Sequence, residues 1–291
     1  MARGGKNRKT ADLIAGAMVL LVAVGLLVAV SLTMKQCTAR LPGSVENPST
    51  TTAVPTQPPE PTLAKNPFGP DDFTYDEKGY LGCLSAESWL GVDVSEHQGS
   101  IDWEKVAQTD VKFAMVRLAY RGWGAEGVIR ADARGMDNLQ GAADAGLKVG
   151  VYFFSQAITV EEAVEEARFL LELLDGRPLD MPVVFDWETV SSEEARTANM
   201  KRKTLNACAL AFCAEIEAAG YDAMVYYNLD LGKWMFDLLA IQQAGYDFWL
   251  AMYSDSLRYG YRVQMWQYSN AGSVSGIKTK VDMNLYFPQT A

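Results

Sequence analysis

The spacing of hydrophobic and polar residues changes twice along this chain. Residues 13–34 form an uncharged apolar run, which as a helix would extend about 33 Å and so match a hydrocarbon core of roughly 30 Å. A polar, proline-rich stretch follows, and from about residue 84 short β-rich runs alternate with helical ones. The pattern predicts a membrane anchor, a spacer and one folded domain.

The predicted anchor has a basic N-terminal flank, which carries Arg3, Lys6, Arg8 and Lys9. By the positive-inside rule, residues 1–12 are a cytoplasmic tail, residues 13–34 a single transmembrane helix, and the rest of the chain extracellular. A cleaved signal peptide stays open as an alternative, because Ala29-Val30-Ser31 would suit a signal peptidase, although the apolar run exceeds the usual length. The expected location is therefore the cell membrane, or the exterior if the segment is cleaved.

The predicted spacer is rich in proline and threonine. Eight of the eleven prolines lie within residues 41–70, and such a segment cannot build a core and stays extended and disordered. We expect residues 35–83 to serve as an extracytoplasmic linker and domain lead-in. The folded domain is then expected over residues 84–291.

The folded domain shows eight β-rich runs. They are predicted at 91–95, 112–117, 147–154, 182–187, 223–227, 248–253, 262–268 and 281–285. Helices are predicted at 101–108, 130–145, 160–174 and 192–219, with Asp102 as a cap and Gly146 and Gly220 as stops. Strands and helices that alternate in this way predict an α/β fold, an irregular TIM-like barrel. An open doubly wound sheet is the alternative, but no glycine-rich phosphate loop follows the first strand.

The distribution of charge along the chain argues against a nucleic acid as partner. The chain carries 26 Lys and Arg against 36 Asp and Glu, yet residues 1–40 hold six basic residues and one acidic residue. The acidic excess therefore falls on the folded domain, which disfavours nucleic-acid binding because that requires Lys and Arg against phosphates. No Cys/His metal spacing is present, and Cys208 and Cys213 lie on different faces of one predicted helix. We expect free thiols, no cofactor, no metal and a monomer.

Candidate chemistry lies at the end of the fourth predicted strand. Asp186 and Glu188 are two residues apart, so both side chains face the same side of a strand. In a βα barrel the carboxyl ends of the strands form the active site. Two carboxylates there repel each other, which raises one pKa and supplies a proton donor near neutral pH, as glycoside hydrolysis requires. The same spacing also occurs in metal sites and helix caps.

Further acidic and aromatic residues lie at the same predicted strand ends. Asp93 is late in the first strand and Asp282 begins the last. Sugar rings pack on aromatic rings, and side-chain amides bind hydroxyl and acetamide groups. The predicted substrate-binding residues are Tyr152, Gln98, Tyr120, Tyr226, Trp266 and Gln267. Trp187 alternates with the two carboxylates and is expected to face the helices as core.

The motifs carry a family resemblance. Over about residues 88–287 the chain resembles glycoside hydrolase family 25, the Chalaropsis-type lysozymes or N-acetylmuramidases. The matching stretches, in the family's order, are GVDVSEHQGSIDW (91–103), VGVYFFS (149–155), PVVFDWE (182–188), WLAMY (249–253) and WQYSNAGSVSGI…VDMN (266–284). The resemblance implies five βα units followed by three β strands. It also implies hydrolysis of the β-1,4 bond between N-acetylmuramic acid and N-acetylglucosamine in peptidoglycan.

The resemblance also assigns roles to the acidic residues. It implies that Glu188 is the general acid and that Asp93, Asp186 and Asp282 line the cleft. One departure is that many members have Tyr-His-Phe where this chain has Tyr152-Phe153-Phe154, which puts a histidine contact in doubt. His97 is the only histidine, and no G-x-S-x-G elbow is present, so carboxylate catalysis is favoured over a Ser-His-Asp scheme.

Two other functions remain open. Chitinase-like barrel enzymes have the pattern D-x-x-D-x-D-x-E at the fourth strand. Residues 181–185 are apolar here, so the earlier acidic residues of that pattern are missing. A non-catalytic wall-binding module, held at the membrane by the N-terminal helix, would not need four clustered acidic residues. The mechanism is open as well, because retention can use a covalent carboxylate nucleophile or the acetamide of the substrate.

Overall fold

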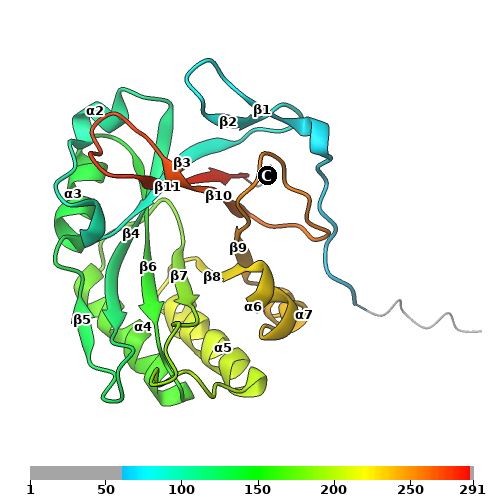
Figure 1. Ribbon diagram of the computed structural model, residues 1–291. Coiled ribbons are helices and arrows are strands. Elements are labelled where there is room, and N and C mark those ends of the chain that lie inside the picture. The colour runs from blue at the N-terminus through cyan, green and yellow to red at the C-terminus, as the bar shows by residue number, and fades with distance from the viewer. Residues whose placement is uncertain (1–60, 289–291) are drawn as a thin grey trace, which may run out of the picture. The chain divides into compact units, whose positions relative to one another are not determined.

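An eight-stranded β-barrel dominates the computed structural model, which describes residues 61–288 (Figure 1). The sheet order is β3-β11-β10-β9-β8-β7-β6-β4, and β3 pairs again with β4, which closes the barrel. Its strands are β3 (Trp89–Val94), β4 (Val111–Arg121), β6 (Lys148–Ser155), β7 (Val183–Trp187), β8 (Ala223–Asn228), β9 (Asp247–Ala251), β10 (Met265–Gly272) and β11 (Val281–Tyr286). The predicted barrel is thus confirmed, and the open sheet is wrong.

Helices follow each of the first five barrel strands and lie outside the sheet (Figure 1). They are α2 (Trp103–Ala107), α3 (Gly135–Asp144), α4 (Val160–Leu174), α5 (Arg202–Ala218), α6 (Leu229–Trp234) and α7 (Leu238–Gln243). Local signals mark where the two longest helices begin or end. The Thr159 side chain caps the start of α4 by accepting from the Glu162 backbone N–H. Gly220, with a positive φ of 88°, follows the end of α5. No helix of the described residues is long and apolar enough to cross a membrane, and the predicted span at 13–34 lies outside them.

The strand residues alternate between two cores. Outward residues pack against the helices, as Phe185 does with Phe212 of α5 at 5.2 Å between ring centroids. Inward residues fill the barrel, among them the buried Phe113, Met115 and Trp249. Gly91 makes room for Phe113, because a Cβ at residue 91 would lie 2.2 Å from that ring.

Strand direction explains how the ends of the barrel are composed. Neighbouring strands are parallel from β3 through β4, β6, β7, β8 and β9 to β10, whereas β11 is antiparallel to both β10 and β3. The first residues of β11 therefore lie at the end of the barrel where the other strands finish. Asp282 of β11 consequently pairs in register with Asp93 of β3.

Two predicted helices begin later than expected. Residues 129–131 do not start a helix but form β5 (Ile129–Ala131), which pairs with Ala119–Arg121 of β4 in a hairpin. Residues 192–201 form turns before α5, and the Arg196 backbone N–H donates to the Trp123 carbonyl in that hairpin at 3.0 Å. In both places these long-range backbone hydrogen bonds replace the local helical ones.

Residues 61–83, which the sequence assigned to the linker and lead-in, pack against the barrel. Strands β1 (Phe73–Tyr75) and β2 (Leu81–Cys83) form a hairpin (Figure 1). Phe73 and Leu81 are buried in the outer core, and the Phe73 ring lies 5.1 Å from Trp266 of β10. Three described cysteines, Cys83, Cys208 and Cys213, are free thiols.

The close approach at Gly91 predicts a stability effect. Gly91→Ala forces a methyl group into the Phe113 ring, and we expect overpacking to lower the free energy of unfolding by about 1–3 kcal/mol. Gly82→Ala is the matched control, since nothing lies within 4 Å of its added Cβ. Denaturant unfolding of the full chain measures both variants, and equal stabilities would contradict the packing argument.

Candidate active site

A cleft of about 250 Å³ opens at the carboxyl end of the barrel. It is lined by Asp93, Ser95, His97, Gln98, Arg117, Tyr152, Phe154, Asp186, Glu188, Tyr226, Trp249, Tyr253, Gln267 and Asp282. The four acidic residues singled out by the sequence thus meet in one cavity, contributed by β3, β11 and the end of β7.

Asp186 and Glu188 enter this cleft from the same face of β7 and its continuation, as predicted. Trp187 between them points the other way into the outer core, where its indole Nε1 donates to the Ala157 carbonyl at 3.2 Å. Asp186 is only 5% exposed, and its buried Oδ1 has no hydrogen-bond partner among residues 61–288. A buried acceptor without a partner is costly, so this oxygen is placed to receive a donor from a ligand.

Asp93 is held by side-chain amides. Its Oδ2 accepts from Gln267 Nε2 at 2.9 Å and from Asn284 Nδ2 at 2.8 Å. Trp249 Nε1 in turn fixes Asn284 by donating to its Oδ1 at 2.8 Å. Burial and the charge of Asp282 raise the pKa of Asp93 well above its ordinary value, although the two amides act in the opposite direction.

The two carboxyl groups at the end of β7 also have raised pKa values. Burial raises the pKa of Asp186 well above its ordinary value, and the charges of Glu188 and Asp93 add to this shift. The pKa of Glu188 is raised by burial and then by the charge of Asp282. Because these groups interact, their protons are shared by the cluster, which retains protons at a pH where isolated carboxyls have lost theirs.

Arg117 of β4 is the cation among the lining residues, and sequence reasoning missed it. Its Nε donates to Asp132 Oδ2 at 2.7 Å and its Nη2 to Glu96 Oε1 at 3.2 Å, which fixes the guanidinium. The positive charge lowers the pKa of Asp186 against the larger effect of burial. The only sequence signal was its position two residues after inward-facing Met115, between the apolar residues 113–116 and 118–119.

The predicted substrate-binding residues divide into two groups. Tyr152, Gln98, Tyr226 and Gln267 line the cleft, and the hydroxyls of Tyr226 and Tyr253 both donate to Gln267 Oε1 at 3.2 Å. Tyr253 also lines the cleft, although it was not among the predicted substrate-binding residues.

Trp266 and Tyr120 are not part of this lining. Trp266 alternates with Gln267 and is fully buried in the outer core, where its Nε1 donates to the Met252 carbonyl at 2.7 Å. Contrary to the prediction, Trp266 therefore does not face the cleft. The Tyr120 ring lies beside the cleft, 5.0 Å from the guanidinium carbon of Arg117.

The departure from the family's third-strand motif falls outside the cleft. Phe153 faces outward and is fully buried, with its ring 6.4 Å from Phe212 of α5. Phe154 and the exposed His97 both line the cavity instead.

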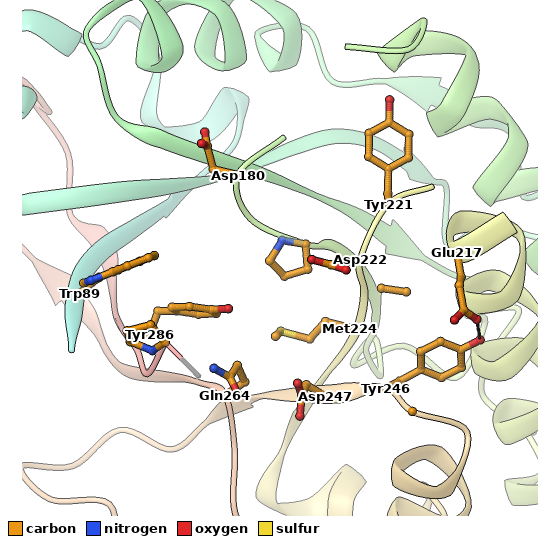
Figure 2. Close-up of a pocket in the computed structure, with 14 residues that line it drawn as sticks. Trp89, Asp180, Glu217, Tyr221, Asp222, Met224, Tyr246, Asp247, Gln264 and Tyr286 are labelled. Carbon is orange, nitrogen blue, oxygen red and sulfur yellow. Dashed lines mark hydrogen bonds between the residues drawn. The ribbon is translucent and has the colours of Figure 1, made fainter. Parts of the chain in front are cut away.

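A larger hollow of about 470 Å³ lies at the opposite end of the barrel, where the parallel strands begin (Figure 2). Trp89 and Tyr286 stack there with centroids 5.5 Å apart, and Tyr246 donates to Glu217 at 3.1 Å. Two of its acidic groups have basic neighbours, since Lys148 lies 4.0 Å from Asp180 and Arg262 3.1 Å from Asp247. In βα barrels chemistry is located at the other end, so the smaller cleft is the candidate active site.

The Arg117 ion pair generates a stability prediction. Arg117→Met leaves the fully buried Asp132 carboxylate without its cation, and we expect a loss of about 3 kcal/mol in unfolding free energy. Arg117→Met combined with Asp132→Asn should recover part of this loss. Arg168→Met is the control, because the exposed Arg168–Glu215 pair should contribute less than about 1 kcal/mol. Equal losses in Arg117→Met and Arg168→Met would contradict the assignment.

Comparison with known proteins finds lysozymes of similar sequence. The chain is 26% identical over 202 residues to the autolytic lysozyme of Clostridium acetobutylicum, covering 67% of this chain and 54% of that protein. It is 26% identical over 240 residues to lysozyme M1 of Streptomyces globisporus, covering 75% and 72%. The chain thus spans about half the length of the clostridial relative.

Solved structures share the fold. A family 25 glycosyl hydrolase from Bacillus anthracis superposes with a TM-score of 0.58 at 21% identity, covering 75% of this chain and 94% of that one. The modular autolysin LytC from Streptococcus pneumoniae gives a TM-score of 0.59 at 23% identity, covering 78% and 52%. The model of the family "Glycosyl hydrolases family 25" matches residues 92–277, which is more than half of the chain and includes Asp93, Asp186 and Glu188. The chain belongs to glycosyl hydrolase family 25.

Proposed function

We propose that this protein is a peptidoglycan hydrolase, a lysozyme of the N-acetylmuramidase type. It would cleave the β-1,4 bond between N-acetylmuramic acid and N-acetylglucosamine by carboxylate acid/base catalysis. The observation that carries the proposal is the buried Asp186 Oδ1, which has no hydrogen-bond partner in the described part of the chain and lies in a cleft shared by four carboxyl groups. Two relatives bear the name lysozyme, and LytC has also been solved in complex with a synthetic peptidoglycan ligand.

In this scheme Glu188 is the general acid. It is half-buried at the rim of the cleft, and burial together with the charge of Asp282 raises its pKa. A carboxyl group that keeps its proton above the ordinary glutamate range can protonate the glycosidic oxygen as the bond breaks. Full exposure to water would remove this proton near neutral pH.

Asp186 acts on the other reacting group. Its Oδ1 is placed to accept a hydrogen bond from the substrate, and the N–H of an acetamide is a donor of the required kind. Such a bond favours the ionised form of Asp186 and so moves a shared proton of the cluster towards Glu188. Asp186 then either stabilises an acetamide-derived intermediate or acts directly at the anomeric carbon.

The other lining residues hold the reacting groups and the sugar. Gln267 connects Asp93 to the hydroxyls of Tyr226 and Tyr253, so one hydrogen-bonded chain crosses the cleft. Tyr253 lines the cleft and is 55% exposed, so its ring is accessible to a sugar. These contacts suit a neutral glycan with acetamide groups, whereas a strongly anionic ligand would meet four carboxyl groups.

We further propose that the enzyme is anchored in the cell membrane with its N-terminus cytoplasmic and the barrel outside. The support is the sequence alone, with its basic flank and the uncharged run at 13–34. A tether would concentrate an acidic enzyme next to an anionic wall. Protease treatment of intact and permeabilised cells, followed by fractionation, tests this: a protein recovered in the medium without residues 1–34 would contradict it.

Removing the acid is the direct functional prediction. Glu188→Gln should lower the rate of peptidoglycan hydrolysis by about 10²–10⁴-fold, because the amide cannot protonate the leaving oxygen, while folding is kept. Glu194→Gln is the control, an exposed carboxyl group on the turns that follow. Release of soluble fragments from purified peptidoglycan measures both. Substantial lysis by Glu188→Gln would reject its role, and chitin cleaved in preference to peptidoglycan would favour a chitinase-like enzyme.

The pH profile gives a second prediction. Activity needs protonated Glu188, so kcat/KM should fall as pH rises through a pKa above the ordinary glutamate value of about 4.3. Asp282→Asn removes a negative charge that raises this pKa, so the falling limb should move to lower pH. Asp255→Asn, outside the cleft, should leave the limb in place. A limb that moves to higher pH in Asp282→Asn would contradict the electrostatic account.

A further inference from the structure

A buried polar network lies directly behind the acid, around the turn that follows β6. Ser155 Oγ donates to Glu166 Oε2 of α4 at 2.6 Å and accepts from the Ala157 backbone N–H at 3.2 Å. Arg121 of β4 donates to the other oxygen of Glu166 at 2.7 Å. Ser155, Arg121 and Glu166 are all buried, so the turn is fixed to two neighbouring elements of the fold.

Gln156 reaches from this turn to the acid. Its side chain is fully buried and does not line the cleft. Its Nε2 donates to the backbone carbonyl of Glu188 at 2.8 Å and to that of Ser155 at 2.9 Å. Its Oε1 accepts from the Thr197 hydroxyl at 3.0 Å. The two backbone carbonyls can only accept, so they fix which way round the amide lies. Both amide hydrogens and the amide oxygen are therefore used.

Glu188 needs such a contact because it lies beyond the sheet. Strand β7 ends at Trp187, and its paired register stops at Trp187 on the β6 side and at Asp186 on the β8 side. The Trp187 indole also donates to the Ala157 carbonyl, so the same turn holds both residues that lead out of the strand. A fixed carbonyl at Glu188 fixes its peptide plane, and with it the direction in which the side chain leaves the backbone.

We propose that Gln156 is a positioning residue for the acid, which clamps the backbone of Glu188 so that its carboxyl group points at the glycosidic oxygen. Thr197 adds a hydrogen bond to the clamp from the segment that follows the acid, and Arg196 Nη1 donates to the Gln156 carbonyl at 3.3 Å. Gln156 touches no substrate and acts only through Glu188. The inference rests on the proposed role of Glu188 as general acid.

The clamp predicts a loss in kcat rather than in substrate binding. Gln156→Leu fills a similar volume but leaves the Glu188 carbonyl free to rotate, and displacement of a catalytic group by about 1 Å lowers rates by up to about 10²-fold. We expect kcat to fall about 10–100-fold in the full chain, with KM changed less than about 3-fold. Steady-state hydrolysis of soluble peptidoglycan fragments measures both constants.

Asn206 supplies the matched control. It too is a buried amide that joins separate segments, since its Nδ2 donates to the carbonyls of Arg202 and Met235 and its Oδ1 accepts from the Asp237 N–H. Because it lies outside the cleft lining, Asn206→Leu should destabilise the fold while kcat stays within about 3-fold of the parent chain. If the two variants lose stability alike but only Gln156→Leu loses kcat, a merely structural role is excluded.

A double-mutant cycle separates the clamp from the acid itself. In the Glu188→Gln background, Gln156→Leu should cause no further loss of residual turnover, because a clamp without an acid has nothing to position. Unchanged kcat in Gln156→Leu, or a full additional loss in the double variant, would overturn the proposal. An active Glu188→Gln chain would instead reject the acid assignment, a distinguishable result.

Thr197→Val covers the case in which Gln156→Leu does not fold. It removes one hydroxyl from a buried site and leaves Gln156 Oε1 without its donor, so the amide is held less firmly against the Glu188 carbonyl. We expect kcat to fall about 3–10-fold at nearly unchanged KM. A Thr197→Val chain with kcat equal to that of the parent, in a folded protein, would count against the clamp.

Discussion

The burial of four carboxyl groups in one cleft is the constraint on which the rest of this structure depends. Asp93, Asp186, Glu188 and Asp282 all have raised pKa values, each chiefly because burial disfavours the charged form. Such a cluster is unstable unless the fold compensates it, and it is useful only if one group keeps a proton. The residues immediately around the cleft both compensate the buried carboxyl groups and allow one of them to keep its proton.

Compensation comes from the way the barrel closes. The antiparallel strand β11 brings Asp282 and Asn284 beside Asp93, and the amides of Gln267 and Asn284 bind the carboxylate that burial would otherwise disfavour. Arg117 supplies a positive charge that is itself fixed by Asp132 and Glu96. Among residues 61–288 the buried Asp186 Oδ1 has no hydrogen-bond partner, and this oxygen is the one that the substrate is proposed to bind.

Much of this could be predicted from the sequence, because alternation and the D-x-E spacing are local signals. They placed Asp186 and Glu188 on one face, and helix 160–174 agrees with α4 to the residue. The same alternation holds for Trp266, which precedes Gln267 and so faces outward. What a single sequence could not supply depends on distant pairing: the β5 hairpin, the direction of β11, and the partners of Arg117 and Gln156.

The most direct test of the central claim is mass analysis of the fragments that the purified full chain releases from peptidoglycan. The account predicts fragments with N-acetylmuramic acid at the reducing end, because the bond cut joins its anomeric carbon to the next N-acetylglucosamine. Fragments with N-acetylglucosamine at the reducing end, or binding to peptidoglycan without any release of fragments, would contradict it.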